Sequence, residues 1–408
     1  MSHGILYNAL KAVKPLRALV RRLRSIWERY RLNAWVLEGA ERTSGEPIRV
    51  LFVGQVENCN YLARVVFGEG PVGRRLHRMW SGRVVSLLNK PVSKYGMVFV
   101  QRQPGADAGL SGQPCFVLPG WLAGELNVAQ GLASHRGNES VKTDLRNIRR
   151  NGFTYRITRE PRELEHFYSA MYLPYVQQTH GDRAFVATQE ELGRESGGRL
   201  ELLLVEQDGK PVAGVYLGIH DRERVDALEL GVAGADRNLV RMGALAAIYY
   251  YALVYAAEGN FPRLYLGGSR PFLHDGALQY KKKWGLYIVG RLHTLPDVFV
   301  FKPRLDNAAV RSFLLNNPFI YEERGAFRAA VFISGQQTSS EKSTDQIRKA
   351  YCLPGLAGAT VFRIDAGATL ALGGNIAPST PPDVALEARL QHDDAAAIAL
   401  IEGSRSVP

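Results

Sequence analysis

The chain has 408 residues, of which 46% are apolar, and this composition supports a sizeable core and excludes a disordered chain. At about 100–200 residues per domain, the length predicts two or three domains. The formal net charge is +12, and residues 1–35 hold eight lysines and arginines against a single acid, Glu28. Because the remainder is only mildly basic, a nucleic-acid groove running along the whole protein is not indicated.

The three cysteines, Cys59, Cys115 and Cys352, lie far apart in the sequence, and no Cys/His spacing suggests a zinc site. Sparse, odd cysteines are typical of reduced thiols in a cytosol. No secretory signal is visible, and the longest uncharged apolar run, Met242–Ala257, is shorter than the ~20 residues that span a bilayer. These features predict a cytoplasmic protein without a metal.

Residues 16–30 carry apolar side chains at helical spacing, with arginines on the opposite face. We therefore predict a basic amphipathic helix in residues 1–40. Such a helix can lie on an anionic membrane, which predicts a peripheral protein at the inner membrane face. Packing on the protein's own surface explains the same pattern, and both interpretations stay open.

Residues 41–135 predict an α/β unit without a chemical motif. Ile48–Val53 is expected to be a buried strand ended by Gly54, and Asn60–Phe67 a helix, whereas Val84–Leu88 and Met97–Gln101 are further strand candidates. The stretch Gly68–Gly73 lacks the Lys-Ser/Thr of a phosphate-binding loop, so no nucleotide is expected there.

Residues 136–303 have the most regular pattern. A helix with aromatic residues at helical spacing is expected at Pro161–Gln178, followed by the order β β β α β α β β. Residues 304–365 predict an α/β extension, and 366–408 a weakly ordered tail. The expected strands are Leu200–Val205, Pro211–Ile219, Val225–Val232, Leu264–Gly267, Leu286–Arg291 and Val298–Phe301, and the expected helices are Leu239–Ala257 and Asp275–Trp284.

This order and five sequence segments resemble the GNAT acyltransferases, in particular the subgroup related to the Fem-type (FemAB-like) aminoacyl transferases, which is often found beside polysaccharide biosynthesis genes. The resemblance implies an α/β (α+β) fold with a GNAT-like mixed sheet flanked by helices. Since Fem-type proteins carry two such halves, it also implies a tandem, with residues 41–135 as a degenerate first half. The segments are Ser140–Gly152, Phe167–Tyr175, Val212–Gly214, Gly243–Ala256 and, most specifically, Gly267–Gly285.

An acyl-CoA donor carries a pyrophosphate, and a helix amino terminus preceded by a glycine turn is suited to bind it. Gly231 and Gly234 end a strand, and two arginines follow where the helix opens. The GNAT signature Arg/Gln-x-x-Gly-x-Gly/Ala is met only by Arg-Met-Gly-Ala at 241–244, which lacks its spacing. Ordinary surface arginines are therefore the alternative to a donor site. The predicted donor-binding residues are Gly231, Val232, Arg237, Arg241, Gly243 and Ala244.

Acyl transfer to an amine needs a base for the ammonium and a proton source for the leaving thiolate. Glu229 is the predicted base, because GNAT enzymes often place a carboxylate on this strand and because it alternates away from Leu228 and Leu230. Asp226 is a weaker candidate. The resemblance implies Tyr280 as the acid. An exposed edge position for Glu229 and simple packing for Tyr280 are the alternatives.

In the GNAT fold the strand before the long helix and the strand after it splay apart, and the acyl thioester lies between them with its carbonyl polarised by a backbone N–H. The acceptor is expected to bind there. Asp275 is also a good helix N-cap, and Lys281–Lys283 fit a solvated helix face equally well. The predicted acceptor-binding residues are Tyr175, Gly267, Gly268, Ser269, Arg270, Asp275 and Lys281.

The favoured function is an acyltransferase that uses acetyl-CoA or another acyl-CoA to acylate an amine or hydroxyl of a sugar or envelope-polysaccharide precursor. One alternative is Fem-type transfer from aminoacyl-tRNA to a cell-wall precursor, which the cluster Arg146, Arg149 and Arg150 favours. Another is a non-catalytic membrane-surface scaffold of GNAT shape. Nucleic acid is not an expected partner, except tRNA under the first alternative.

Overall fold

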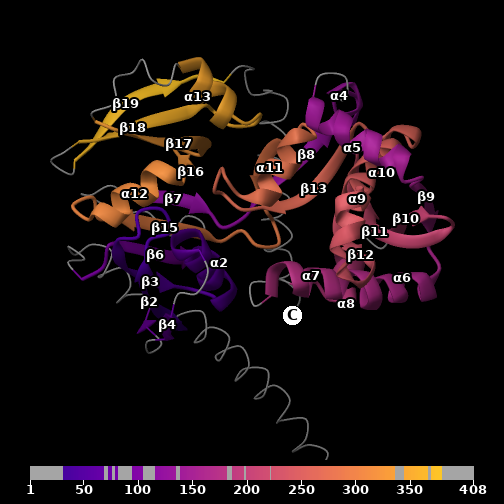
Figure 1. Cartoon of the computed structure of the whole chain (residues 1–408), viewed down its shortest axis with the longest axis horizontal. Coiled ribbons are helices and arrows are strands. Elements are labelled where there is room, and N and C mark those ends of the chain that lie inside the picture. Colours follow the sequence, from indigo (N-terminus) through magenta and orange to yellow (C-terminus); the bar gives the residue numbers. More distant parts are fainter. Residues whose placement is uncertain are drawn as a thin grey trace, which may run out of the picture. The chain divides into compact units, whose positions relative to one another are not determined.

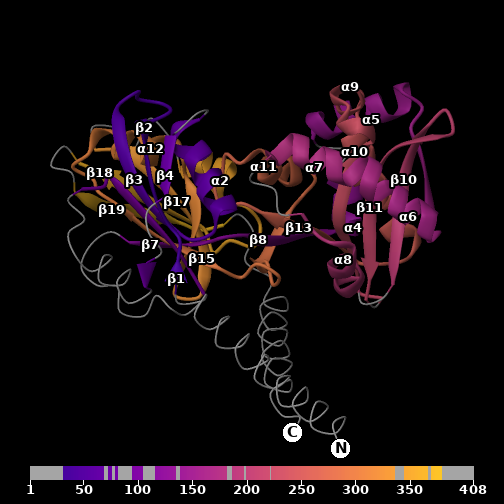
Figure 2. The same ribbon diagram turned by 90° about the horizontal axis from the view of Figure 1, so that it is seen from below.

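A computed structural model describes eleven segments of the chain, which form two compact units (Figures 1 and 2). Unit 1 draws on Met1–Cys115 and Phe299–Phe313, and unit 2 on Phe116–Val298 and Leu314–Pro408. The predicted strand at 84–88 and residues 336–343 lie outside the described residues, as does the predicted helix at 16–30. The described residues are 31–68, 72–75, 79–80, 94–103, 115–134, 138–181, 186–196, 199–220, 222–335, 344–365 and 369–378.

Unit 1 contains a sheet with the strand order β15-β6-β3-β2-β4. β3 and β6 run parallel, with Val50–Val53 beside Met97–Val100, and α2 lies between them in the chain. The helix predicted for residues 1–40 does not extend to residue 40, because Ala34–Ala40 form the strand β2. The elements are β1 (Arg31–Leu32), β2 (Ala34–Ala40), β3 (Pro47–Val53), α2 (Val56–Phe67), β4 (Val72–Arg75), β5 (Met79–Trp80), β6 (Met97–Arg102) and β15 (Val298–Pro303).

Unit 2 contains a seven-stranded sheet with the order β14-β8-β13-β12-β11-β10-β9. β9 to β12 form an antiparallel series, and the helices after β12 return the chain so that β13 runs parallel to β12. β8 lies between β13 and β14, antiparallel to both. The strands are β8 (Leu122–Asn127), β9 (Thr154–Thr158), β10 (Leu200–Gln207), β11 (Lys210–Ile219), β12 (Arg224–Val232), β13 (Arg263–Ser269) and β14 (Tyr287–Arg291).

Helices cover both faces of this sheet. In β10, Leu203 and Val205 pack into the core beneath α5 and α10, whereas Leu202 and Leu204 pack against the aromatic residues of α6, η1 and α7. This alternation is what a strand buried on both faces requires. The helices are α4 (Val128–Ser134), α5 (Glu139–Arg150), α6 (Pro161–Phe167), the π-helix η1 (Tyr168–Tyr172), α7 (Leu173–His180), α8 (Gln189–Glu195), the 3₁₀ turn η3 (Ala233–Ala235), α9 (Arg237–Met242), α10 (Ala244–Glu258) and α11 (Gly276–Lys283).

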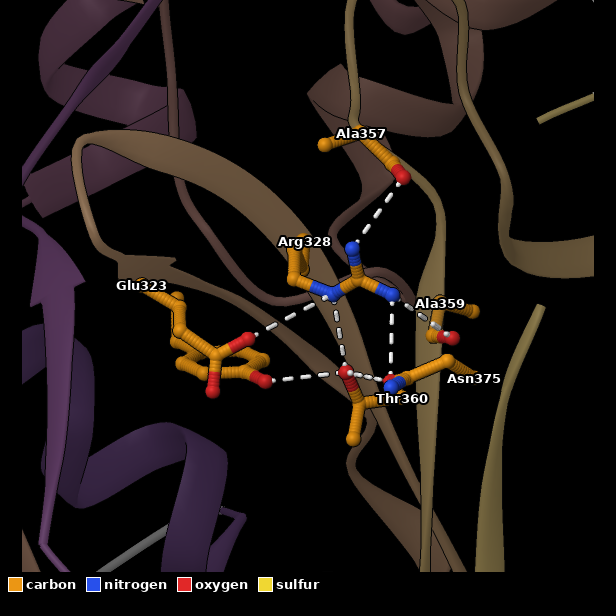
Figure 3. Close-up of polar contacts among 7 residues, drawn as sticks. Glu323, Arg328, Ala357, Ala359, Thr360 and Asn375 are labelled. Carbon is orange, nitrogen blue, oxygen red and sulfur yellow. Dashed lines mark hydrogen bonds and ion pairs between the residues drawn. The ribbon is translucent and has the colours of Figure 1, made fainter. Parts of the chain in front are cut away.

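The remaining strands of unit 2 have the order β19-β18-β17-β16-β7. Four of them are joined by a polar cluster around Arg328 (Figure 3). Thr360 Oγ1 accepts hydrogen bonds from Arg328 Nε and from the Tyr321 hydroxyl, both at 2.9 Å, and donates one to Asn375 Oδ1 at 3.1 Å. The elements are β7 (Phe116–Pro119), β16 (Phe319–Glu323), β17 (Ala326–Ser334), α13 (Thr344–Tyr351), β18 (Ala359–Ile364) and β19 (Leu370–Ile376). The helix α12 (Ala308–Asn316) belongs for the most part to the segment of unit 1.

The predicted α/β class and the order β β β α β α β β are confirmed, because two mixed α/β units are present and each predicted strand between residues 200 and 301 exists. The strand–helix–parallel strand arrangement occurs twice, as β3–α2–β6 and as β12–α10–β13, which agrees with a tandem. Two details differ from expectation. β8 comes from the predicted first half but belongs to the sheet of unit 2, and β19 lies inside the predicted tail.

Candidate functional site

The ladder between β12 and β13 ends early. Their parallel pairing runs from Arg224–Arg263 to Asp226–Tyr265 and goes no further among the residues described. At Gly267 the backbone has φ of 66°, a left-handed conformation that favours glycine, and the register of β13 against β8 shifts at this point. The carboxyl half of β12 is therefore left without pairing to β13, in the arrangement expected for a GNAT-type sheet.

A β-bulge in β12 sets the direction of Glu229. The register against β11 jumps from Val215–Leu230 to Leu217–Ala227, so two residues of β12 oppose one residue of β11. Bulges of this kind re-aim side chains and are common beside active sites. Leu230 packs on the α10 face of the sheet, whereas Leu228 packs on the η1 face. The simple alternation predicted for Leu228, Glu229 and Leu230 is therefore wrong.

Glu229 forms a hydrogen bond with the hydroxyl of Tyr172, on the η1 face of the sheet. Burial, together with the charge of Glu229, raises the pKa of Tyr172. The tyrosine oxygen in turn accepts a hydrogen bond from the backbone N–H of Ala187 at 2.9 Å. Tyr172 ends the π-helix η1, and π-helical turns are frequent at functional sites. The carboxylate thus has a tyrosine partner that the sequence did not predict.

Lys281 approaches the same place from α11. Its side chain is buried, with 7% exposed, and its Nζ donates to the carbonyl oxygen of Gly268 at 2.6 Å. Burial lowers the pKa of Lys281 to about 8, although the charges of Asp275 and Glu229 act in the opposite direction. Glu229, Tyr172 and Lys281 are called the carboxylate cluster below, because the charge of Glu229 raises the pKa of both Tyr172 and Lys281.

The three lysines of α11 do not form a solvated face. Lys282 donates to the backbone oxygen of Ala350 at 2.7 Å. Lys283 forms an ion pair with Asp144 of α5 and lies over the ring of Tyr280 at 3.8 Å. Each lysine thus has a different direction, and Lys281 alone of the three is directed at β13.

Tyr280 belongs to a separate aromatic group. Its ring centroid lies 5.2 Å from that of Tyr249, and burial raises its pKa, with smaller contributions from Asp144, Tyr249 and Tyr175. Tyr175 is itself buried enough to raise its pKa. The role of Tyr280 as an acid and the role of Tyr175 in acceptor binding remain predictions. The tyrosine bonded to Glu229 is Tyr172.

Other predicted acceptor residues have structural partners. Arg270 donates to the carbonyl oxygen of Gly120 at 3.1 Å and stacks 3.8 Å above the ring of Trp121. Gly268 leaves room for the ring of Trp121, since a Cβ at position 268 would lie 2.9 Å from that ring. Asp275 accepts hydrogen bonds from two backbone N–H groups of α11, as an N-cap does. Ser269 is buried, with 2% of its surface exposed. Acceptor binding by these residues remains a prediction.

Asp226, the weaker base candidate, is engaged elsewhere. Its carboxylate forms a 2.6 Å ion pair with Arg224, and His220 lies at 3.4 Å. Both contacts lie at the paired end of β12 and β13, beside the buried Glu125 of β8. Both carboxylate oxygens of Asp226 accept hydrogen bonds from the Arg224 guanidinium, at 2.6 and 3.0 Å, so this carboxylate is part of a structural ion pair. Glu229 is the better candidate.

The predicted donor region differs from expectation in one respect. The helix predicted over Leu239–Ala257 breaks at Gly243, whose φ of 108° ends α9 and begins α10. Gly231 has a packing role, because a Cβ there would lie 2.6 Å from backbone atoms of Met171 and Tyr172. Val232 and Ala244 are buried. Donor binding by these residues remains a prediction.

Five exposed arginines gather near this break. Arg237 and Arg241 lie on α9, and the end of α5 packs against the α9–α10 junction, where Asn151 Nδ2 donates to the oxygen of Met242 at 2.8 Å. In the described part of the chain, none of the five has an acidic partner within 4.0 Å. We call this set the arginine surface: Arg146, Arg149, Arg150, Arg237 and Arg241.

In unit 1, the helix that follows the parallel strand is α2, and a side chain of the protein fills the space at its amino end. Gln101, at the end of β6, places its Oε1 2.9 Å from the backbone N of Gln55 and 2.9 Å from Asn58 Nδ2. A Cβ at Gly54 would lie 2.5 Å from that oxygen. The amino end of α2 is thus occupied by a side-chain amide. That residues 41–135 are a degenerate first half remains a prediction.

Among the described residues, no set of three or more His, Cys, Asp or Glu side chains is arranged to hold a metal ion. No described helix is both long and apolar enough to cross a bilayer.

No family model matches the sequence, and no curated protein is similar to it at a significant level. Among solved structures, the chain is similar to the C-terminal domain of a putative lysylphosphatidylglycerol synthetase from Agrobacterium fabrum (15% identity, 68% of this chain and 83% of that chain, TM-score 0.33). It is also similar to L-PGS from Bacillus licheniformis (10%, 65% and 84%, 0.34) and to a GCN5-related N-acetyltransferase from Kribbella flavida (14%, 50% and 67%, 0.26). At these values the similarities say nothing of this chain's substrate or activity.

Proposed function

We propose that the protein is an acyltransferase in which Glu229 is the general base. The observation that carries the proposal is the carboxylate cluster itself. It combines a carboxylate, a tyrosine hydroxyl and a buried ammonium where two parallel strands stop pairing. Acyl transfer needs these groups, since a proton must leave the nucleophile, another must reach the leaving group, and the carbonyl oxygen becomes negative.

In the proposed reaction the donor is an acyl thioester, acetyl-CoA or a longer acyl-CoA. The nucleophile attacks the thioester carbon while Glu229 accepts its proton, and the collapsing intermediate releases the thiolate. Tyr172, already bonded to Glu229, is placed to pass a proton to the sulfur. The Nζ of Lys281 is placed to stabilise the negative oxygen, an interaction that is strong in a buried site.

The arginine surface is the proposed anchor for the phosphates of the donor. Its arginines lie beside Gly243, where α10 opens without a side-chain cap. Arginines bind phosphate with two parallel hydrogen bonds, and backbone N–H groups at a helix start add to this. From the sequence resemblance we further propose a sugar or envelope-polysaccharide precursor as acceptor. A site of action at the cytoplasmic membrane face, through residues 1–35, belongs to the same proposal.

The decisive test is thiol release from acetyl-CoA and longer acyl-CoAs, measured with mixed saccharide acceptors. Glu229→Gln keeps the shape and a hydrogen-bond acceptor for Tyr172 but removes the base. We expect kcat to fall by about 10²–10⁴-fold. Glu190→Gln, at an exposed position of α8, is the matched control and should retain full activity. Unchanged turnover in Glu229→Gln, with the fold intact by circular dichroism, would rule out the base assignment.

The arginine surface also favours a second function, transfer from aminoacyl-tRNA. Five exposed arginines on two helices offer more positive charge than one pyrophosphate needs, and tRNA is a polyanion. Thermal-shift titrations with acetyl-CoA, longer acyl-CoAs and deacylated tRNA separate the two. An acyl-CoA donor is supported if CoA species stabilise the wild type and the Arg162→Gln variant but do not stabilise Arg241→Gln. Stabilisation by tRNA alone supports the second function, and none by any ligand supports a non-catalytic scaffold.

A further inference from the structure

Tyr216 of β11 is in contact with two irregular elements at once. In the ladder between β11 and β12, it is the single residue that lies opposite the two bulged residues of β12. Its hydroxyl leaves the sheet and donates a hydrogen bond to the backbone oxygen of Leu164 in α6 at 2.6 Å. The side chain is 1% exposed and packs edge-on against Phe167, with ring centroids 4.8 Å apart. Tyr216 therefore joins the bulge of β12 to the helical segment that carries Tyr172.

The bond to Leu164 lies where the hydrogen bonding of α6 changes to the π-helical pattern of η1. The backbone N–H of Tyr168 is shared between the oxygens of Leu164 and Glu165. The backbone N–H of Leu173 then reaches back to the oxygen of Tyr168, five residues earlier. Because the Tyr216 hydroxyl is a second donor to the Leu164 oxygen, it stabilises the helix at this transition.

The other end of η1 rests directly on β12. A Cβ at Gly231 would lie 2.6 Å from the backbone N of Tyr172. The cross-strand partner of Gly231 is Gly214, where a Cβ would lie 3.0 Å from the ring of Phe167. This pair of glycines lets the helix approach the sheet more closely than side chains would permit. The segment η1 is thus held at its carboxyl end by Gly231 and at its amino end by the Tyr216 hydroxyl.

The peptide of Ala187 fixes the tyrosine hydroxyls of η1. Tyr168 donates to the oxygen of Ala187 at 3.1 Å, and the N–H of Ala187 donates to the Tyr172 oxygen at 2.9 Å. Since Tyr172 is the acceptor in that bond, its own proton is available to Glu229. The direction of this proton therefore depends on where η1 places the Tyr172 ring.

We infer that Tyr216 is a positioning residue for acyl transfer, which fixes η1 and through it the hydroxyl of Tyr172. The inference rests on the proposed function, in which Tyr172 passes a proton to the leaving thiolate. The Tyr216 hydroxyl is engaged by Leu164 and takes no part in the proton transfers itself. A shift of η1 towards α-helical hydrogen bonding would displace Tyr172 relative to Glu229, because one residue in an α-helix corresponds to a rotation of roughly 100°.

The test compares Tyr216→Phe, which removes the hydroxyl and keeps the ring, with the wild type as the full chain. The assay is thiol release from acyl-CoA with the saccharide acceptors. We expect kcat to fall by roughly 10-fold and KM to change by less than ~2-fold, since a misplaced catalytic group slows the chemical step. Tyr251→Phe is the matched control, because it removes a hydroxyl that also donates to a backbone oxygen, that of Phe153. It should keep full activity.

A double-mutant cycle separates positioning from a general loss of stability. If Tyr216 acts through Tyr172, then Tyr216→Phe should lower kcat by less than ~2-fold in a Tyr172→Phe background. Fluorine NMR of the full chain with 3-fluorotyrosine at position 172 gives a second readout that needs no turnover. Its resonance should move in Tyr216→Phe and stay in place in Tyr251→Phe.

The outcomes are distinguishable. An equal loss of kcat in both backgrounds, or an unmoved fluorine resonance in Tyr216→Phe, overturns the inference while leaving acyl transfer standing. Thiol release that does not depend on Glu229 refutes the proposed function, and the catalytic role of this positioning fails with it. If Tyr216→Phe does not fold, Gly231→Ala replaces it in both measurements, because it displaces the same segment at its carboxyl end.

Discussion

Replacing Lys281 by methionine should reveal how much free energy the buried ammonium costs. Burial lowers the pKa of Lys281 from its ordinary 10.5 to about 8. One pKa unit corresponds to about 1.4 kcal/mol, so below pH 8 the charged lysine destabilises the folded protein by about 3 kcal/mol. Because the folded pKa is the lower one, the unfolded state binds more protons between pH 8 and 10.5. The cost is therefore fully present below pH 8 and disappears as the pH approaches 10.5.

The measurement is urea unfolding of the wild type and Lys281→Met at pH 7 and pH 9.5. The stability advantage of the variant over the wild type should shrink by about 2 kcal/mol between these two values. Taking the difference between two proteins cancels the tyrosines, which also titrate at high pH. Lys210→Met, at the exposed first position of β11, is the control and should show a constant difference. A constant difference for Lys281→Met as well would refute the buried, charged lysine.

Four further substitutions test the packing. Thr360→Val removes the oxygen bonded by Arg328 and Tyr321 and should cost about 1–3 kcal/mol in urea unfolding, whereas Thr369→Val, at a site with one exposed hydrogen bond, should cost under ~1 kcal/mol. Gly231→Ala places a methyl 2.6 Å from the η1 backbone and should cost about 1–3 kcal/mol. Gly193→Ala, in α8 with open space around it, should instead stabilise by about 0.5–1 kcal/mol, and equal effects of the two would contradict the close approach at Gly231.

The regular part of unit 2 was predictable because its pattern is local. Alternating apolar residues fixed β10, β11 and β12, and the Asp208-Gly209 pair fixed the turn between the first two. The break at Gly243 was not predicted, because a single glycine in an apolar helical stretch is usually tolerated. Here the Cβ of Asn147, in α5, comes within 3.3 Å of where a Cβ at 243 would lie. Because Asn147 and Gly243 are almost a hundred residues apart in the sequence, the residues around Gly243 give no sign of the helix break.

The same contrast between local and long-range signals applies to the candidate site. Glu229 could be identified as a candidate from its place before the long helix, but its direction depends on a bulge that pairs two residues with Tyr216 of another strand. Tyr172 lay in the predicted aromatic stripe, where spacing alone assigns such residues to the core. The available signal was its position within the segment Phe167–Tyr175 that resembles the family. Which of its tyrosines reaches Glu229 depends on the π-helix, which periodicity does not reveal.

The two strand–helix–strand arrangements explain why a site is expected in one unit alone. In unit 1, β3 and β6 stay paired through Val53–Val100, and Gln101 then fills the amino end of α2 with its own amide. In unit 2 the pairing of β12 and β13 ends after Asp226, and α11 supplies Lys281 beside the unpaired strand. The block Gly267–Gly285 carries both the left-handed glycine and this lysine. The most specific segment of the sequence therefore lies where the two strand–helix–strand arrangements differ.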